Sequence, residues 1–369
     1  TQEWFMNSSN AIVAATIAFG MGIDKAAIRY VYHFNLPKSL ENYSQEIGRA
    51  GRDGKPSTCE IIACADDITV LENFTFGDTP EPTAVAALVE AILAHTDEFD
   101  ISTYELSQQH DVRPLVVNTL LTYLELAEVI EATAPFYNEY QFQPLRSSRE
   151  ILAAFEGERL VFLRALFHAA VKARTWFSID LEKTAELLEC PRERLIKALT
   201  YLEEKGDLTL KVTGLRHGYR IRKRPADVEA LIRQLNERFA LRERNDVGRV
   251  RQVAELVSEP GCMVRALLRH FGERLEGDCG HCGICLGDAP VTLHRDAHRE
   301  MLEEQRHAIQ VLRSAHPHGL RSSRQIARFL CGITSPVAVQ SKLTKHPLFG
   351  VLLDVPFNLV LEFAESMEK

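Results

Sequence analysis

The first part of the chain shows short apolar runs separated by polar or turn-forming segments. The runs span residues 11–17, 30–34 and 58–63. This spacing is typical of buried parallel strands joined by helical crossovers, so we expect an α/β sheet in which residues 12–17 form a buried strand. Gly20 and Gly22 follow that run and predict a tight turn where the backbone can approach a ligand closely.

From residue 102 the apolar spacing becomes helical, and one pattern occurs twice. Residues 102–132 and 180–212 each predict a short helix, a turn and a longer amphipathic helix. Strand-like segments follow each copy, at residues 135–144 and 214–221. Both copies resemble winged-helix modules, whose longer helix can enter a DNA groove while the β-hairpin touches the backbone. Winged helices also serve as protein–protein spacers, and the pattern leaves both uses open.

Length and composition indicate a globular protein with several cores. A chain of 369 residues exceeds what one core usually supports, so roughly two to four domains are expected. A net charge of −8 argues against a uniformly basic nucleic-acid coat, but it allows local basic patches. The sequence has no apolar run long enough to span a membrane and no visible secretory signal. We therefore expect no membrane partner and a cytoplasmic location.

A pair of arginines is the first candidate site. The stretch QEIGRAGRDG, residues 45–54, places Arg49 and Arg52 three positions apart. On a helix this spacing puts both guanidinium groups on one face, where they can clamp a phosphate. The alternative is an unrelated strand–turn–helix with a surface arginine pair, which would leave the ordered glycines unexplained.

Together with two upstream stretches, this block resembles a known family. The stretches are ATIAFGMGID at residues 15–24 and FNLPKSLENYSQE at residues 34–46. The combined string is similar to motifs V and VI of superfamily 2 helicases. The closest resemblance is to the RecQ family, whose members use ATP to unwind duplex DNA in the 3′ to 5′ direction.

The RecQ resemblance implies a role for individual residues. Arg52 matches an arginine finger that reaches the γ-phosphate across an interdomain cleft, with Arg49 and Gln45 as catalytic residues beside it. Nucleotide contacts are implied for Gly22 and Asp24, in addition to the two arginines. Thr16 matches a position near the DNA backbone.

The nucleotide site implied by this resemblance is incomplete. The phosphate-binding pattern G-x-x-x-x-G-K-[ST] does not occur in the sequence. In RecQ helicases it belongs to the first motor domain, which precedes motif V. We therefore expect residues 1–77 to be a partial second RecA-like domain. ATP and Mg²⁺ would be bound mainly by the first RecA-like domain of a longer protein, and this chain alone would be inactive.

A cysteine cluster is the second candidate site. The chain has eight cysteines, and four of them, Cys262, Cys279, Cys282 and Cys285, follow the pattern C-x16-C-x2-C-x2-C. Two-residue spacers bend the chain so that successive sulfurs can face one ion, which favours a structural, tetrahedral Zn²⁺ site. Four reduced buried cysteines and an iron–sulfur cluster are the alternatives. We expect Cys262 to come from a helix and the other three from a tight loop, with His281 a bystander.

The cysteine spacing and the lead-in CMVRALLRHFGE, residues 262–273, resemble the zinc-binding subdomain of RecQ helicases. In that family the cysteines follow motif VI closely, whereas here a long insertion separates them. We expect an insertion with two winged-helix-like modules at residues 78–236, the zinc-binding subdomain at 237–290, and a helix plus a winged-helix-like module at 291–369. The fold class is thus α/β plus mainly α.

Basic residues in the second copy and near the C-terminus are candidate phosphate contacts. The predicted DNA-binding residues besides Thr16 are Arg192, Arg194, Lys197, Arg220, Arg222, Arg224, Arg324 and Lys345. A basic run can equally be a solvated face. The first copy is more acidic near its helix end and is expected to pack rather than to bind DNA.

The leading hypothesis is the C-terminal portion of an ATP-dependent RecQ-like DNA helicase acting in DNA repair, recombination and replication. Its partners would be single-strand/duplex junctions of DNA and the first RecA-like domain, at the nucleoid of a bacterial-type cell. The alternative is a non-catalytic winged-helix/zinc DNA-binding protein that retains a helicase remnant. RNA as the substrate also stays open, although the zinc spacing favours DNA.

Overall fold

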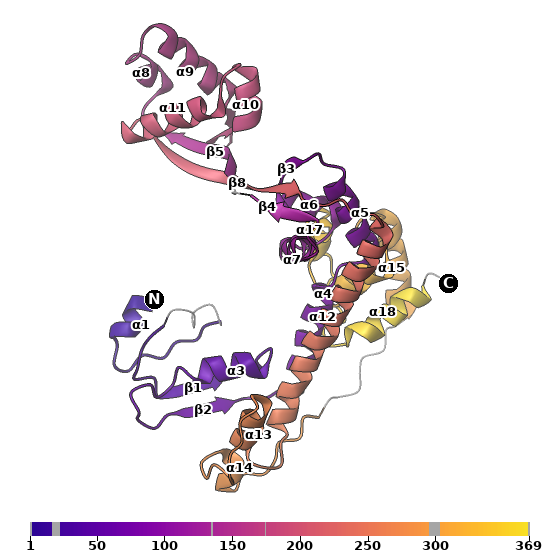
Figure 1. Ribbon diagram of the computed structural model, residues 1–369. Helices are drawn as coiled ribbons and strands as arrows, with labels where there is room; N and C mark the ends of the chain where they lie inside the picture. The colour runs from indigo at the N-terminus through magenta and orange to yellow at the C-terminus, as the bar shows by residue number, and fades with distance from the viewer. Residues whose placement is uncertain (1, 17–22, 134–135, 174, 295–302, 368–369) are drawn as a thin grey trace. The chain divides into compact units, whose positions relative to one another are not determined.

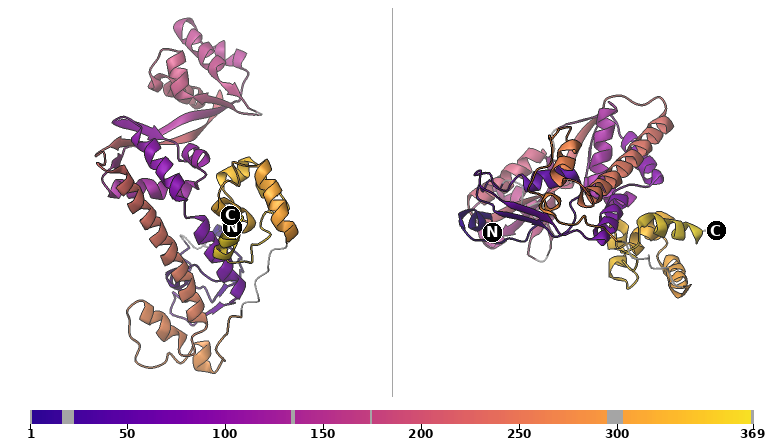
Figure 2. Two further views of the ribbon diagram at one scale, coloured as in Figure 1. Left: turned by 90° about the vertical axis from the view of Figure 1, so that its right-hand side faces the viewer. Right: turned by 90° about the horizontal axis from the view of Figure 1, so that it is seen from below.

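A computed structural model describes residues 2–16, 23–133, 136–173, 175–294 and 303–367. The chain divides into two compact units. One unit contains Thr1–Pro82 and Arg233–Lys369, and the other contains Thr83–Ile232. The elements of both units are drawn in Figures 1 and 2.

The first unit begins with a small α/β part. Strands β1 (Tyr30–His33) and β2 (Thr58–Ile61) pair in parallel. Parallel strands need a crossover, and the segment that contains helix α3 (Leu40–Ile47) supplies it. Helix α1 (Gln2–Asn7) precedes the sheet, and helix α4 (Ala65–Gly77) follows it.

The buried strand predicted at residues 12–17 is not formed in the part that is described. Residues 11–16 have no regular secondary structure, and Ile12 is 94% exposed. The prediction is wrong here because a strand is stable only when a neighbour pairs its N–H and C=O groups, and no described strand lies beside this segment. Ile17, Gly20 and Gly22 belong to the same prediction and lie outside the described residues.

One face of the β1–β2 sheet is covered by helices. Tyr43 of α3 and Ile68 of α4 share a core with Val253 of helix α12 (Val228–Val257). Ile61 of β2 packs against that core. Helix α12 has 30 residues, and its later part contributes Val250, Val253 and Leu256 to this core. Helix α13 (Met263–His270) adds Met263 and Leu267 to the same packing.

The second unit contains two modules of helices and strands. The first is built from α5 (Pro82–Leu93), β3 (Glu98–Ile101), α6 (Thr103–His110), α7 (Pro114–Leu126) and β4 (Ile130–Ala132). Its helices bury Val89, Val117 and Leu124 completely. Helix α6 begins where the Ser102 hydroxyl accepts a hydrogen bond from the Glu105 N–H, at 3.2 Å, so the start of this helix is capped by its own sequence.

The second module has its own core. Its elements are β5 (Phe136–Pro144), α8 (Ser148–Leu152), α9 (Gly157–Ala169), β6 (Val171–Lys172), β7 (Phe177–Asp180), α10 (Leu181–Leu187) and α11 (Arg192–Glu204). Leu166, Ile179 and Leu199 are fully buried between the helices and the sheet. The capping box of α8, formed by Ser147 and Glu150, starts the helical part after β5.

Strand β8 (Leu208–Ile221) serves both modules, as Figure 1 shows. Its first part pairs with β5, from Leu208 opposite Pro144 to Arg216 opposite Phe136. Its last part pairs with β3 and β4, with His217 opposite Ile101 and Ile221 opposite Ile130. The second module is therefore inserted into the hairpin of the first module.

This arrangement corrects one sequence prediction. Residues 214–221 were expected to close the second copy, but residues 217–221 complete the sheet of the first. The second copy instead uses β5, which precedes its helices, as the strand between β7 and β8. Its strand order along the chain is thus circularly permuted, because the chain enters this module through the hairpin of the first.

The remainder of the first unit is helical. It contains α13, α14 (Gly283–Leu286), α15 (Glu303–Ala315), α16 (Ser323–Leu330), α17 (Pro336–Gln340), the 3-10 helix η1 (Leu343–Lys345) and α18 (Phe357–Ser366). Residues 303–367 include no strand. The hairpin that a winged-helix-like module would have here is therefore not formed in the described residues, because the segment between η1 and α18 folds as turns.

These C-terminal helices are fixed to α4. The Asn73 side chain donates to the Val355 carbonyl at 3.2 Å and accepts from the Phe357 N–H at 3.0 Å. The ring of Phe76 stacks on the ring of Phe357, with centroids 5.1 Å apart. Satisfied polar groups inside an apolar contact favour one docking geometry, so α4 is part of the C-terminal core and not a linker.

The observed architecture agrees with the expected class of α/β plus mainly α. None of the described helices is both long and apolar enough to span a membrane.

Gly332 provides a test of this C-terminal packing. Its φ is +70°, and a Cβ atom there would lie 3.2 Å from the Gly350 Cα. Gly332→Ala should therefore lower the free energy of unfolding by about 1–3 kcal/mol, measured by chemical denaturation. In Gly248→Ala, on α12, the new Cβ meets no atom within 4 Å, so this control should be neutral or slightly stabilising. Equal effects in the two variants would contradict the packing described.

Candidate functional site

The arginine pair lies in a turn and not on a helix. Helix α3 begins after Ser39, whose hydroxyl accepts from the Asn42 N–H, and ends at Ile47 with Gly48 as its C-cap. Residues 48–53 form turns. The expectation that Arg49 and Arg52 share one helix face is therefore wrong, because the helix ends before both.

The turn still brings the two arginines to the same segment. The Arg52 Nη1 lies 2.7 Å from the Asp24 Oδ1, and the Arg52 Nε donates to the Gly48 carbonyl at 3.3 Å. The half-buried Arg49 donates from Nη1 to the Ile23 carbonyl at 3.4 Å. Residues 23–24 thus meet both arginines. The Arg52 side chain is 42% exposed, so its guanidinium can be reached from solvent.

Gly51 and a neighbouring ion pair shape this turn. Gly51 has a φ of +62°, and a Cβ there would lie 2.8 Å from the Lys55 carbonyl, so the position requires glycine. Arg29 pairs with Asp53 and donates to the Lys55 carbonyl at 3.1 Å. Sequence reasoning missed the contribution of Arg29 to this turn. The one feature of the sequence that could have indicated it is the position of Arg29 directly before β1.

Helix α3 is anchored to the cysteine-bearing part of the same unit. The His270 Nε2 of α13 lies 2.9 Å from the Glu41 Oε1. Hydrogen bonds from Ser39 and His270 lower the pKa of Glu41 to about 2. Burial raises the pKa of Tyr43, two residues further along α3, to about 12. The start of the helix that leads to the arginines is thus fixed by charged and buried contacts.

The structure shows less about the other two residues that were predicted to contact the nucleotide, Gln45 and Gly22. Gln45 is exposed on α3. Gly22 lies outside the described residues. The structure therefore brings together Asp24, Arg49 and Arg52, and it does not describe a contact between Gln45 and them.

The four clustered cysteines converge on one point. Their sulfur atoms all lie within 4.8 Å of one another, with Cys282 and Cys285 at 3.4 Å and Cys279 and Cys285 at 3.8 Å. Sulfurs around a tetrahedral zinc at ordinary Zn–S distances are about 3.8 Å apart. The described residues contain no other group of His, Cys, Asp or Glu of this kind.

The surroundings of the sulfurs suit thiolate ligands. The Cys262 Sγ accepts from the Cys279 N–H at 3.3 Å, and the Cys279 Sγ accepts from the Cys282 N–H at 3.2 Å. Burial alone would raise the pKa of Cys282, but hydrogen bonds from Cys285 outweigh it and lower that pKa to about 6. A backbone hydrogen bond with Gly280 lowers the pKa of Cys285, but burial and side-chain hydrogen bonds with the other three cysteines outweigh it and raise that pKa to about 12, so the cluster favours thiolates unequally. A thiolate is the form that binds a metal, so the donor set fits Zn²⁺.

The origins of the ligands differ slightly from the prediction. Cys262 is the N-cap of α13 and not a helical residue, and Cys285 lies within α14 and not in a loop. His281 is exposed and its Nδ1 lies 2.8 Å from the Cys279 carbonyl oxygen. Sequence reasoning missed the ion pair between Arg265 and Asp278 at 2.9 Å, although each is within three residues of a cysteine of the cluster.

The basic residues predicted on α11 are only partly free for a ligand. Arg194 pairs with Glu158 at 2.7 Å and lies over the Phe162 ring, with its Cζ 4.4 Å from the centroid. Arg192 is half-buried, whereas Lys197 is exposed. Arg194 is also exposed, but its guanidinium is paired with Glu158, so Lys197 is the better candidate for a ligand.

The cations at the end of β8 also divide into two kinds. Arg224 donates to the carbonyls of Leu93 and His95, both at 2.7 Å, and so closes the C-terminal end of α5. Arg220 lies 3.7 Å from Glu131 and keeps half of its side chain exposed, and Arg222 is exposed. Arg224 thus has a packing function that its sequence position did not indicate.

The last predicted DNA contacts are Arg324, Lys345 and Thr16. Arg324 is largely buried: it pairs with Glu243 at 2.7 Å and donates to the Phe76 carbonyl at 2.8 Å. Lys345 and Thr16 are exposed. Of these three, only Lys345 offers an accessible positive charge.

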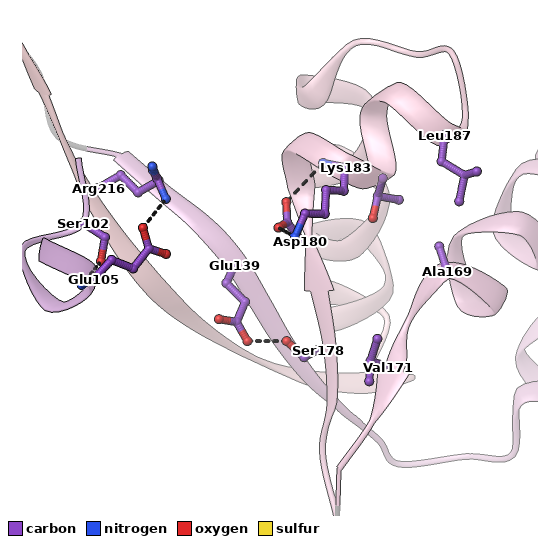
Figure 3. Close-up of a pocket in the computed structure, with 11 residues that line it drawn as sticks. Ser102, Glu105, Glu139, Ala169, Val171, Ser178, Asp180, Lys183, Leu187 and Arg216 are labelled. Carbon is purple, nitrogen blue, oxygen red and sulfur yellow. Dashed lines mark hydrogen bonds and ion pairs between the residues drawn. The ribbon is translucent and has the colours of Figure 1, made fainter. Parts of the chain in front are cut away.

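The second unit also contains a cavity of about 340 Å³, drawn in Figure 3. Arg216 pairs with Asp100 and lies 3.4 Å from Glu105, while Lys183 lies 3.4 Å from Asp180. Burial by itself lowers the pKa of Arg216, but the hydrogen bond and charge of Asp100 raise it above its usual value. The lining holds three carboxylates, Glu105, Glu139 and Asp180, against the two cations Lys183 and Arg216. Both cations are paired with carboxylates, which leaves little to attract an anionic ligand.

Two family descriptions match this chain. "Helicase conserved C-terminal domain" matches residues 1–54, and "RecQ zinc-binding" matches residues 225–286. The first stretch contains residues 23–24 and residues 48–53, which we call the arginine turn. The second contains all four cysteines of the cluster. The chain is related to the RecQ family of helicases.

Individual relatives agree with this assignment. The "ATP-dependent DNA helicase Q-like 5" of Arabidopsis thaliana is 26% identical over 393 residues, which cover 99% of this chain and 40% of that protein. The "ATP-dependent DNA helicase RecQ" of Bacillus subtilis is 52% identical over 69 residues, 19% of this chain and 12% of that protein. The "Probable ATP-dependent DNA helicase RecS" of the same organism is 39% identical over 99 residues, 27% of this chain and 20% of that protein. The matched part is thus 40% or less of each relative.

For the RecQ-related chain, the zinc-binding match and the cysteine geometry together support Zn²⁺ as the bound metal. Purified protein should contain about one zinc per chain by metal analysis. Cys282→Ser should lose most of this zinc, whereas Cys64→Ser, which changes an exposed cysteine outside the cluster, should retain it. Iron with visible absorbance would favour an iron–sulfur cluster, and no metal at all would contradict the site.

Proposed function

We propose that this chain is the C-terminal portion of an ATP-dependent 3′–5′ DNA helicase of the RecQ family. The observation that carries the proposal is the meeting of Arg49 and Arg52 with residues 23–24, within the stretch that matches the helicase C-terminal domain. We extend the proposal to a role in DNA repair, recombination and replication, which follows from the family resemblance alone.

In the proposed mechanism Arg52 is the arginine finger. It reaches the γ-phosphate of ATP held by a first RecA-like domain and stabilises the negative charge that develops as the phosphoryl group leaves. To do so it exchanges its present partner, the exposed Asp24, for the phosphate. An ion pair between exposed groups stabilises by only about 0–1 kcal/mol, so this exchange costs little.

The neighbours of the finger have supporting roles in this proposal. Arg49 is held against the Ile23 carbonyl and links the turn to the segment that carries Asp24. We assign contacts to the nucleotide to Gln45, from α3, and to Gly22. Most of the contacts to ATP and Mg²⁺ come from the first RecA-like domain of the full-length protein. This chain alone is therefore proposed to be inactive.

We assign the zinc a structural function. Cys262, Cys279, Cys282 and Cys285 would complete its tetrahedral shell and leave no open position for catalysis. The ion would then join the start of α13 to α14. Since His270 of α13 contacts Glu41 of α3, the metal would also steady the helix that leads to the arginine turn.

The proposed DNA contacts follow the accessible charges. We retain Lys197, Arg220, Arg222 and Lys345 as phosphate contacts, with Thr16 as a neutral backbone contact. Arg192, Arg194, Arg224 and Arg324 are buried or bound to other groups of the protein, so we assign them chiefly to packing. The proposed substrate is DNA at a junction of single and double strands, and the proposed location is the nucleoid.

A second candidate is a non-catalytic winged-helix/zinc DNA-binding protein that retains a helicase remnant. The two inserted modules and the distance between the arginines and the cysteines along the chain favour it. A protein that only binds DNA, however, does not need Arg49 and Arg52 to be held together against residues 23–24. ATP turnover by the full-length protein separates the two candidates.

Arg52→Ala in the full-length protein should lower ATP turnover by roughly a thousandfold, because arginine fingers contribute 10³–10⁵ to the rate. Steady-state phosphate release measures this, with DNA present. Lys38→Ala changes an exposed cation in the same α/β part and should leave turnover unchanged. Near-normal turnover in Arg52→Ala would argue for the non-catalytic candidate.

The DNA contacts can be tested on this chain. Replacement of both Arg220 and Arg222 by Ala should weaken duplex binding and reduce the slope of log affinity against log salt by about 1–2. Fluorescence anisotropy at several salt concentrations measures both quantities.

Arg224→Ala is the matched control for that experiment. It should lower the melting temperature, because the carbonyls of Leu93 and His95 lose their donor. The salt slope of the folded protein should stay the same. A change in slope for Arg224→Ala, or none for the double variant, would reverse the assignment of these residues.

A further inference from the structure

Helix α3 is joined to strand β1 by a buried pair of polar side chains. The His33 Nε2 lies 2.6 Å from the Glu46 Oε2, and the two side chains are 9% and 21% exposed. The rings of His33 and Tyr43 pack edge to face, with their centroids 5.2 Å apart. Tyr43 and Glu46 are three positions apart on α3 and therefore lie on one face of the helix. His33 thus holds that face at two points.

The second ring nitrogen defines how the pair is bonded. The His33 Nδ1 is buried and has no hydrogen-bond partner among the residues that the structure describes. A proton on Nδ1 would be a buried donor without an acceptor. The favoured tautomer therefore carries its proton on Nε2 and donates it to the Glu46 carboxylate. Since only one of the two nitrogens has a partner, only one orientation of the ring makes this bond.

The pair lies at the end of α3 that leads into the arginine turn. The Glu46 carbonyl accepts from the Arg49 N–H at 3.4 Å. Further along the turn, the Gly51 N–H donates to the Ile28 carbonyl at 3.0 Å. Ile28 and His33 belong to the same short segment, which contains β1. The arginine turn is therefore held on both sides by the chain around β1.

A buried polar pair contributes little stability, so its position is the more informative property. Removal of two polar groups from water offsets much of what their mutual hydrogen bond returns, and apolar side chains of similar size often stabilise a fold equally well. An apolar contact, however, allows a helix to slide and rotate. A hydrogen bond with one donor and one acceptor specifies a single arrangement. The pair of His33 and Glu46 therefore fixes the rotation of α3 and the point from which the turn departs.

We propose that His33 is a positioning residue for Arg52. Through Glu46 it holds the end of α3, from which the turn carries both arginines to residues 23–24. The inference rests on the proposed function, because the position of Arg52 affects a rate only if its guanidinium meets a phosphate. His33 itself contacts no nucleotide. A displacement of about 1 Å away from the chemistry can lower a rate by about a hundredfold, so one directional contact at the end of α3 is sufficient for this effect.

Two substitutions separate the hydrogen bond of His33 from its bulk. The amide nitrogen of His33→Gln can reach the place of Nε2 and donate to Glu46, whereas the shorter amide of His33→Asn ends near the place of Nδ1. In the full-length protein, His33→Asn should lower kcat for ATP turnover by about ten- to a hundredfold. The KM for ATP should change by less than about twofold, because most contacts to ATP are assigned to the first RecA-like domain. His33→Gln should keep most of kcat.

Three results would overturn the proposal: a normal kcat in His33→Asn, an equal loss of kcat in both variants, or a change confined to KM. His307→Asn changes an exposed histidine of α15 and is the control, with kcat and KM unchanged. In the Arg52→Ala background, His33→Asn should cause no further loss of kcat, because the two residues act through one contact. A further loss would show that His33 acts by another route, which also contradicts the proposal.

A double variant covers the case in which His33→Asn does not fold. His33→Phe combined with Glu46→Leu makes both partners apolar and leaves no buried group unsatisfied, so the melting temperature should stay close to that of the parent. The kcat should nevertheless fall as in His33→Asn. A normal kcat in this double variant would show that the pair only fills space, and would reject the positioning role.

Hydrogen exchange measures the position of the turn without ATP. In this chain the Gly51 N–H should exchange about tenfold faster in His33→Asn than in the parent, and at the parental rate in His33→Gln. Unchanged exchange in His33→Asn would overturn the proposal. Failure of the proposed function gives a different result, namely normal ATP turnover in Arg52→Ala while the exchange of Gly51 still responds to His33. That result would reject the finger and keep the hold of His33 on the turn.

Discussion

A strand persists only where another backbone satisfies its N–H and C=O groups, and this constraint organises the whole chain. Strand β8 is 14 residues long because β5 pairs with one part of it and β3 and β4 pair with the other. Residues 11–16 are more apolar than β8, but they have no described partner and form no strand. Strands β1 and β2 are an intermediate case, because among the described strands each pairs only with the other.

Arg49 and Arg52 were expected on one face of a helix, but two glycines of a turn position them instead. Gly48 ends α3. Gly51 has a positive φ, and a side chain at this position would collide with the Lys55 carbonyl. The chain therefore reverses within a few residues and directs both Arg49 and Arg52 to residues 23–24. The accessibility of Arg52 and the weakness of its exposed ion pair are what a residue needs if it is to change partners during a reaction cycle.

Features with local causes were predictable from the sequence, and features with distant partners were not. The cysteine cluster follows from ligand spacing alone, and the helix pairs of the insertion follow from apolar periodicity. The pairing of residues 217–220 with β3 could not be seen, because it joins residues more than a hundred positions apart. For the same reason Arg224 and Arg324 read as free cations, although one bonds to carbonyls at the end of α5 and the other to Glu243.

The shared strand has a consequence for how this architecture could be gained or lost. Phe136 and Arg216 stand opposite each other in the ribbon, so the two connections to the inserted module leave the first module side by side. A deletion between them would shorten the hairpin and leave the pairing of β8 with β3 and β4 in place. The inserted module could therefore be removed or exchanged, in evolution or by protein engineering, by joining the chain between Phe136 and Arg216. The fold of the first module would not need to change.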